Sequence, residues 1–139
     1  MQAAERVVVD TNVIVSGILL PASTPGRLPD FLARHGSLIF SAATRDELLS
    51  VIAREKFDRY VPFDARERAV AIFLRECEIV SPRRLFQVCR DARDDKFLDA
   101  AYAGKVDCLI SGDADLTTLG QFEGIPIIRA ARYLAAAGR

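Results

Sequence analysis

Short apolar runs alternate along the chain with longer segments in which apolar residues recur at helical spacing. The runs are 7–9, 38–40, 79–80, 108–110 and 125–128, and the helical segments are about 13–20, 28–34, 44–55, 65–76, 94–104 and 130–137. Strands that are apolar on both faces are typical of a parallel sheet covered by helices. Strands that alternate with helices build such a sheet. The pattern predicts the α/β class, a mainly parallel central sheet between two helical layers in an α/β/α sandwich.

Several residues predict where these elements begin and end. Gly36 is expected to stop the second helical segment. Asp64 stands three residues before Glu67, which is the spacing of a capping box at a helix start. Pro126 lies inside the last strand and lacks an N–H group, so that strand is expected at an edge of the sheet.

Size and composition indicate an ordinary globular protein. The 139 residues fit one domain, 1–139, and 50% of them are hydrophobic. No apolar run approaches the roughly 20 residues that span a bilayer, and no signal peptide is visible, so a cytoplasmic protein without membrane contact is expected. Lysine plus arginine equals aspartate plus glutamate at 19 each, so any nucleic-acid site must be a local basic patch.

Acidic residues stand where two of the apolar runs end. Asp10 directly follows the first run, and Asp113 closely follows the fourth. The ligand crevice of an open α/β sheet lies at the carboxyl ends of its strands, so both side chains are expected to face one pocket. Glu47, in the first turn of the helix after the second strand, and Asp94, at the start of a later helix, project from the same rim. Four carboxylates are therefore expected to converge.

Four carboxylates in one cleft resist joint ionisation, and a divalent cation removes that conflict. All-oxygen ligands suit Mg²⁺ or Mn²⁺, and the chain has no C-x-x-C pair that would favour zinc. Such ions activate water, orient a phosphate and stabilise a leaving oxygen. Phosphodiester hydrolysis is the expected reaction, with one ion or two.

Each of these acidic residues also has a purely structural interpretation. Thr44 stands three residues before Glu47, so Glu47 fits a capping box as well as it fits a metal site. Asp94 and Asp115 are each placed to cap a helix, and Asp113 is placed to stabilise a turn. Their joint placement on one rim is what favours a shared site.

Four acidic segments, in this order, resemble the motifs of PIN domains. They are V-V-V-D-T-N-V-I-V-S-G-I-L around Asp10, S-A-A-T-R-D-E-L-L-S-V-I-A-R-E-K-F around Glu47, R-D-A-R-D-D-K-F-L-D-A-A around Asp94, and L-I-S-G-D-A-D-L around Asp113. The resemblance covers essentially the whole chain and is strongest to bacterial toxin components of toxin–antitoxin systems, the VapC-type group. Ala92 follows Asp91 where that group usually has proline, which alters loop stiffness and removes no ligand.

The resemblance implies a metal-dependent endoribonuclease that hydrolyses phosphodiester bonds of single-stranded RNA. It implies that Asp10, Glu47 and Asp94 are core metal ligands, with Asp113 completing the cluster and Asp115 close enough to contribute. These are the catalytic and metal-binding candidates.

Further expectations come from the same resemblance. Asn12 and Ser111 match polar positions that orient ligands or substrate. Asp95, beside Asp94, is a second candidate for coordination, although Asp94 is favoured. The implied partners are RNA, a small antitoxin protein that blocks the site, and further copies of the chain in a homodimer or higher homo-oligomer.

Arginines cluster before the Asp94 motif, at positions 83, 84, 90 and 93. Arg90 and Arg93 are candidate contacts for RNA phosphates flanking the scissile one. Charged loops more often are simply solvated, which is the alternative interpretation.

Other functions fit the residues less well. A haloacid-dehalogenase-type phosphatase needs an aspartate where Asn12 stands, and a receiver domain needs a lysine after a late strand, where Ser111-Gly112-Asp113 stands instead. The alternative from another class is a PIN-fold module that binds RNA or protein without cutting, which the intact acidic set argues against.

Overall fold

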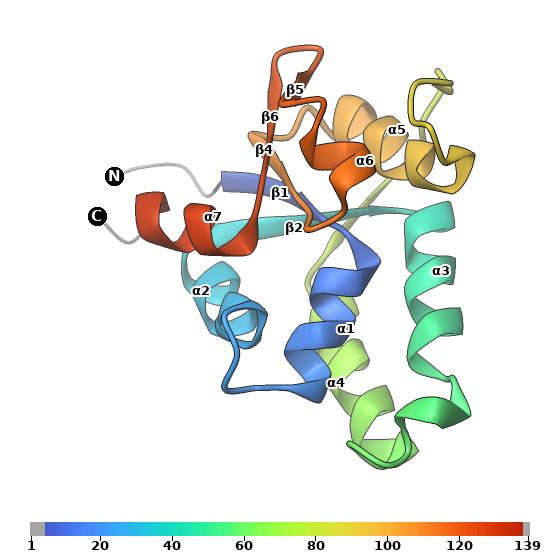
Figure 1. Ribbon diagram of the computed structural model, residues 1–139, viewed down its shortest axis with the longest axis vertical. Coiled ribbons are helices and arrows are strands. Elements are labelled where there is room, and N and C mark those ends of the chain that lie inside the picture. The colour runs from blue at the N-terminus through green and yellow to red at the C-terminus, as the bar shows by residue number, and fades with distance from the viewer. Residues whose placement is uncertain (1–4, 138–139) are drawn as a thin grey trace.

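The computed structural model describes residues 5–137, in which a six-stranded sheet has helices on both faces (Figure 1). The strands are β1 (Glu5–Val9), β2 (Gly36–Ser41), β3 (Glu78–Val80), β4 (Cys108–Ile110), β5 (Gln121–Phe122) and β6 (Ile125–Ile128). Their order across the sheet is β3-β2-β1-β4-β6-β5. Every neighbouring pair is parallel except β5 with β6. The predicted α/β class and mainly parallel sheet are confirmed.

The predicted helical segments are found with small shifts at their ends, and the short helix Ala114–Thr117 was not among them. They are α1 (Thr11–Leu19), α2 (Leu28–His35), α3 (Ala42–Ile52), α4 (Phe63–Arg75), α5 (Asp95–Gly104), α6 (Ala114–Thr117) and α7 (Ala130–Ala137). Short 3-10 turns occur at Pro25–Arg27, Glu55–Phe57 and Ala92–Asp94. Gly36 ends α2 as expected, in an extended conformation that starts β2. None of the helices within residues 5–137 has both the length and the apolarity to cross a membrane.

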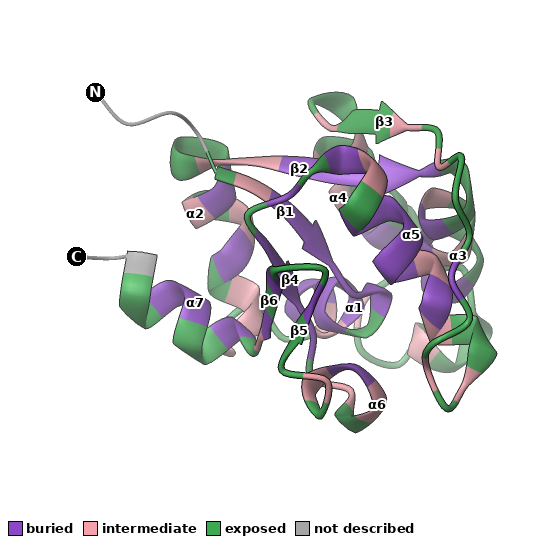
Figure 2. Ribbon diagram, turned by 90° about the horizontal axis from the view of Figure 1, so that it is seen from above, coloured by how far each residue is buried: buried purple, intermediate pink, exposed green. Residues whose placement is uncertain are grey.

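Two hydrophobic cores cover the two faces of the sheet. Side chains alternate along β1, so Val7 and Val9 join one core and Val8 joins the other. The first core is built with α1, α2, α3, α4 and α7, whereas the second is built with α5, α6 and β5. Figure 2 shows the buried central strands between these layers. Burial on both faces explains why β1 and β4 are continuously apolar.

Two predictions about element ends are wrong. Pro126 does not mark an edge strand, because β6 lies between β4 and β5 in the sheet. The edge strand β5 has two residues and is too short to give an apolar run in the sequence. Asp64 and Glu67 form no capping box, because α4 begins at Phe63 with Pro62 as its cap and no side-chain cap bond. Asp64 instead pairs with Arg68 one turn later at 3.5 Å.

Candidate metal centre

The candidate site lies where β1 and β4 end side by side. Val9 pairs with Ile110, which places Asp10 next to Ser111 at the carboxyl edge of the sheet. The backbone N–H of Asp10 donates to the carbonyl of Ile110 at 2.8 Å, and that of Ser111 donates to the carbonyl of Ile128 at 2.9 Å. The sheet ladder therefore fixes both residues before any side chain is considered.

Asp10 is the most firmly held carboxylate of the site. Only 3% of its surface is exposed. Its Oδ2 accepts from the Ser111 hydroxyl at 2.7 Å, and its Oδ1 accepts from the backbone N–H of Asn12 at 3.2 Å. Burial raises the pKa of Asp10, and the nearby charges of Asp113 and Glu47 raise it further. The fold thus holds a carboxylate where its negative charge is unfavourable.

Three more carboxylates form a tight group beside it, which we call the acidic rim: Asp94, Asp113 and Asp115. One oxygen from each lies within 4.8 Å of the others. Asp113 caps α6, because its Oδ1 accepts from the backbone N–H of Asp115 at 2.8 Å. Its own N–H donates to the Ser111 hydroxyl at 3.0 Å, so one serine connects Asp10 to the rim.

Asp94 carries the clearest sign of an unmet interaction. Its Oδ2 is buried and has no hydrogen-bond partner within the described part of the chain, 5–137. Asp94 also makes no side-chain cap bond at the start of α5, so the capping interpretation does not account for it. Desolvation raises the pKa of Asp94 to about 6, and Asp113 and Asp10 add repulsion. A buried carboxylate oxygen without a donor is a natural place for a cation.

Glu47 is not a helix cap. The capping box of α3 is formed by Ser41 and Thr44. Glu47 instead accepts from the Thr11 hydroxyl at 2.5 Å and from the Lys96 ammonium at 2.6 Å. It lies outside the group of three, although its charge reaches Asp10. Sequence reasoning missed Lys96; its position two residues after Asp94 was the available signal.

Asp95 is bound to the backbone of the segment that precedes it. It is buried, and its Oδ1 accepts from the backbone N–H groups of Val88 and Cys89 at 3.1 and 2.8 Å. The two adjacent aspartates therefore differ, because the chain supplies donors to Oδ1 of Asp95 but supplies none within residues 5–137 to Oδ2 of Asp94.

The remaining predicted residues divide by exposure. Ser111 is fully buried, and its hydroxyl donates to Asp10. The Asn12 side chain is exposed beside the site. Arg90 donates to Asp115 at 2.6 Å, whereas Arg93 pairs with Asp91 at 2.9 Å, and both guanidinium groups are largely open to solvent.

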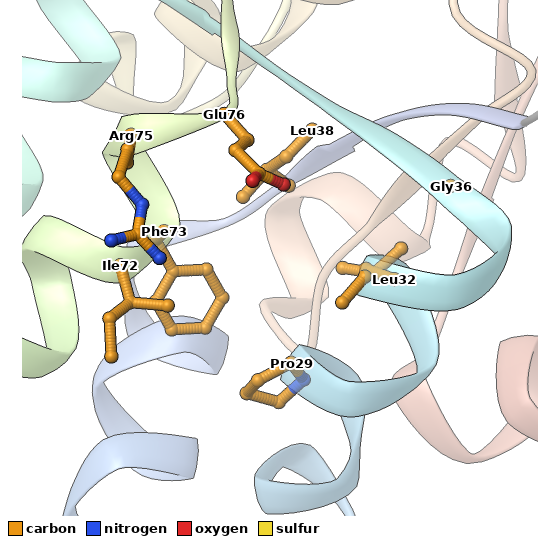
Figure 3. Close-up of a pocket in the computed structure, with 9 residues that line it drawn as sticks. Pro29, Leu32, Gly36, Leu38, Ile72, Phe73, Arg75 and Glu76 are labelled. Atoms are coloured by element: carbon orange, nitrogen blue, oxygen red, sulfur yellow. The ribbon is translucent and has the colours of Figure 1, made fainter.

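A cavity on another part of the molecule has different chemistry. It measures about 330 Å³ and lies between α2 and α4, near the amino end of β2 (Figure 3). Pro29, Leu32 and Phe73 line it, with Arg75 and Glu76 at its margin. One carboxylate among apolar groups is no metal centre, so the convergent oxygens at the carboxyl edge remain the candidate site.

Comparison with known proteins identifies the family. The PIN domain family matches residues 6–115 of the chain. The chain belongs to the PIN domain family. An uncharacterized protein of Methanocaldococcus jannaschii is 31% identical over 116 residues, which cover 82% of this chain and 74% of that protein.

Solved structures share the fold of this chain at low identity. A protein of Pyrobaculum aerophilum superposes with a TM-score of 0.61 at 15% identity, covering 98% of this chain and 91% of that one. VapBC2 of Rickettsia felis, bound to a DNA fragment from its promoter, gives 0.59 at 14%, covering 88% and 96%. The sarcin-ricin loop cleaving toxin VapC20 of Mycobacterium tuberculosis gives 0.52 at 15%, covering 86% and 98%. The predicted membership of the PIN domain family is confirmed by the family match, and these solved structures share the fold of the chain.

The residues of the PIN site fit a hard divalent cation. Asp94, Asp113 and Asp115 offer only oxygen atoms, which suit Mg²⁺ or Mn²⁺. The unpartnered Oδ2 of Asp94 supports this fit, and the raised pKa of Asp94 agrees with it.

Proposed function

We propose that this PIN domain is a metal-dependent endoribonuclease that hydrolyses phosphodiester bonds of single-stranded RNA. The observation that carries the proposal is the unpartnered, buried Oδ2 of Asp94 inside a group of three carboxylates at the carboxyl edge of the sheet. PIN family membership and the likeness to VapC20, a sarcin-ricin loop cleaving toxin, support RNA as the substrate.

In this proposal Asp10, Asp94 and Asp113 hold Mg²⁺ or Mn²⁺, with Asp115 and Glu47 as further ligands. A divalent ion held there supplies Lewis-acid activation of the attacking water and the scissile phosphate. Ser111 keeps Asp10 in place through its hydroxyl, which is the kind of outer contact that tunes a metal site.

The exposed residues around the site would hold the substrate. The Asn12 side chain is free to contact the RNA backbone from the first turn of α1. The Lys96 ammonium, beside Glu47, places a positive charge where a phosphate would approach. Arg90 and Arg93 are proposed to contact the flanking phosphates, since both side chains extend into solvent.

A partner protein and self-association belong to the same proposal. The likeness to VapBC2 of Rickettsia felis supports a small antitoxin that blocks the site. We also propose a homodimer or a higher homo-oligomer. Co-purification with the product of a neighbouring reading frame would test the first point, and light scattering of the pure chain would test the second.

One observation favours a second candidate function. Lys96 pairs with Glu47, and Arg90 pairs with Asp115, so the chain itself supplies cations to part of the site. A PIN module neutralised in this way would bind RNA or protein without cutting it.

Cleavage of single-stranded RNA distinguishes the two candidates. The chain is incubated with RNA and Mg²⁺ or Mn²⁺, with EDTA, and as Asp10→Asn, with Asp64→Asn as a matched control far from the site. Metal-dependent cutting that disappears in EDTA and in Asp10→Asn, and that persists in Asp64→Asn, supports the nuclease. Cutting that persists in Asp10→Asn or in EDTA contradicts it, whereas binding without any cutting supports the second candidate.

A further inference from the structure

A segment of irregular backbone runs along α5 toward the acidic rim. We call residues 83–90 the strap; it is the yellow segment beside α5 in Figure 1. The backbone N–H of Phe86 donates to Asp99 at 2.8 Å, and those of Val88 and Cys89 donate to Asp95. Because Asp95 precedes Asp99 by one helical turn, the strap runs antiparallel to α5. Both aspartates are buried, so the strap has a fixed position on the helix.

Positive charge concentrates on the strap and its flanks. Residues 81–93 contain four arginines and one acidic residue, Asp91, in a chain whose overall charge is balanced. Arg90 reaches Asp115 of the acidic rim at 2.6 Å, so the end of the strap adjoins the site. Arg83 and Arg84 have no ion pair within residues 5–137. Their charge is available to a ligand that approaches from solvent.

Arg84 is stacked on aromatic rings. Its guanidinium carbon lies 4.6 Å from the Phe86 ring centre and 5.9 Å from the Tyr102 ring centre. The two rings contact each other edge to face at 5.2 Å. Phe86 is buried, whereas Arg84 is exposed and Tyr102 is 40% exposed. The arrangement is an exposed guanidinium over an aromatic pair, in which Tyr102 is also partly open to solvent.

Such a surface matches the bases of an unpaired strand. Bases of single-stranded RNA stack on aromatic rings and on guanidinium planes, whereas a double helix hides those faces. Tyr102 lies eight residues after Asp94, which is about 12 Å along a helix axis. Roughly three stacked nucleotides at about 3.4 Å each would cover that distance.

We propose that the strap binds single-stranded RNA, with one base stacked on Arg84 and Tyr102 and with Arg83 and Arg90 on phosphates. The strand then runs along α5 to the acidic rim. The proposal rests on the proposed ribonuclease function and gives it a reason to prefer unpaired RNA. An acidic peptide would match the charges of the strap but not the stacking surface, so RNA is the favoured ligand.

Binding is measured apart from cleavage, by fluorescence anisotropy of labelled single-stranded and double-stranded RNA in EDTA. Arg84→Ala and Tyr102→Leu should each weaken single-strand binding about 5- to 150-fold, the range for loss of one stacked base. Arg68→Ala, an exposed arginine on α4, is the matched control and should change it less than twofold. Arg83→Ala, which removes a proposed phosphate contact, should lower the salt dependence of binding, whereas Tyr102→Leu should not.

Several results would overturn the proposal. Unchanged single-strand binding in Arg84→Ala and in Tyr102→Leu would do so, as would equal losses of binding to single- and double-stranded RNA. If these two variants lose binding to a labelled acidic peptide but keep RNA binding, the strap binds a protein partner instead.

The strap and the ribonuclease proposal fail in different ways. If the wild-type chain cuts RNA but the strap variants bind and cut like wild type, the strap proposal fails and the nuclease stands. If the wild-type chain never cuts but the strap variants still lose single-strand binding, the nuclease fails and the strap stands. Circular dichroism of each variant checks that it is folded.

Discussion

The acidic rim and the buried arginine of α4 are two charged places that the fold treats in opposite ways. Arg66 is completely buried, yet its guanidinium donates to the carbonyls of Ile52, Val61 and Arg54 and to the carboxylate of Asp58. These contacts join the end of α3 to the start of α4. All the partners belong to the chain, so the charge is satisfied from within.

The rim is the reverse case. Asp94 keeps a buried oxygen without a donor among residues 5–137, and its neighbours repel it. A buried polar group that the chain satisfies serves stability, whereas one left unsatisfied in a native fold has some other cause, such as a bound ion. Arg66 and Asp94 therefore differ in whether the chain itself supplies their hydrogen-bond partners. This criterion separates structural charges from functional ones better than burial does.

Removal of the Asp94 carboxylate tests the functional role of the acidic rim. Asp94→Asn is expected to reduce RNA cleavage about 1000-fold, since loss of metal charge stabilisation amounts to several kcal/mol. The free energy of unfolding of the metal-free chain should stay the same or rise, because a repelled carboxylate is removed. Cleavage rates with Mn²⁺ and urea denaturation in EDTA measure the two effects.

The adjacent residue supplies a control for that variant. Asp95→Asn removes a satisfied carboxylate, so it should lower stability by about 1–3 kcal/mol and leave a folded enzyme with much of its activity. If Asp95→Asn abolished cleavage and Asp94→Asn did not, the assignment of the two aspartates would be reversed.

Removal of the Arg66 guanidinium tests the structural role of the buried arginine. Arg66→Ala is expected to lower the free energy of unfolding by about 3–5 kcal/mol, because buried carbonyls lose their donors. Arg68→Ala, an exposed arginine on the same helix, should change it by less than about 0.5 kcal/mol. Urea denaturation measures both variants, and equal small effects would show that the Arg66 contacts contribute little.

The hydrophobic pattern of the sequence was sufficient to predict the layers of the fold and the positions of two site residues. Asp10 and Asp113 are predictable because each follows a strand of the parallel sheet, and parallel strands bring their carboxyl ends to one edge. The strand β5 was missed because two residues paired antiparallel to β6 leave no periodic signal. Its presence is decided by tertiary packing, including that of Phe122 in the second core.

Side-chain partners were the part that spacing could not decide. Thr44 and Glu47 have capping-box spacing, but the helix begins at Ala42, so Ser41 takes the cap and Glu47 turns to Lys96. Asp94 and Asp95 differ by one residue on a helix, which is about 100° of rotation, and only the folded strap shows which is satisfied.

Loss of the hydrogen bond that holds Asp10 should reduce cleavage less than loss of a carboxylate does. Ser111→Ala removes the hydroxyl that donates to Asp10 and accepts from the N–H of Asp113. Loss of such an outer contact lowers metal affinity or activity about 10- to 100-fold. Titration of cleavage with Mn²⁺ should show a higher metal requirement. A maximal rate and metal requirement equal to wild type would exclude Ser111 from orienting the site.

The smallest expected effect is a pH dependence of stability in the metal-free chain. The pKa of Asp94 is raised to about 6 from an ordinary value of 3.8, so the folded state holds this proton more tightly than the unfolded state does. The resulting stability is fully present below about pH 4 and is lost as the pH rises through about 6. Because Asp94 is only partly buried, solvent screening limits the effect to about 1 kcal/mol.

Comparison of wild type with Asp94→Asn separates the pH-dependent stability due to Asp94 from that due to the other titrating groups. In EDTA, raising the pH from 5 to 7 should destabilise wild type more than Asp94→Asn, as measured by urea denaturation at both pH values. Mn²⁺ should abolish the difference at pH 7, because a bound cation replaces the proton as the partner of the carboxylate. Identical pH slopes for the two proteins would mean that Asp94 ionises normally, and the rim would then resemble a solvated acidic surface more than a metal centre.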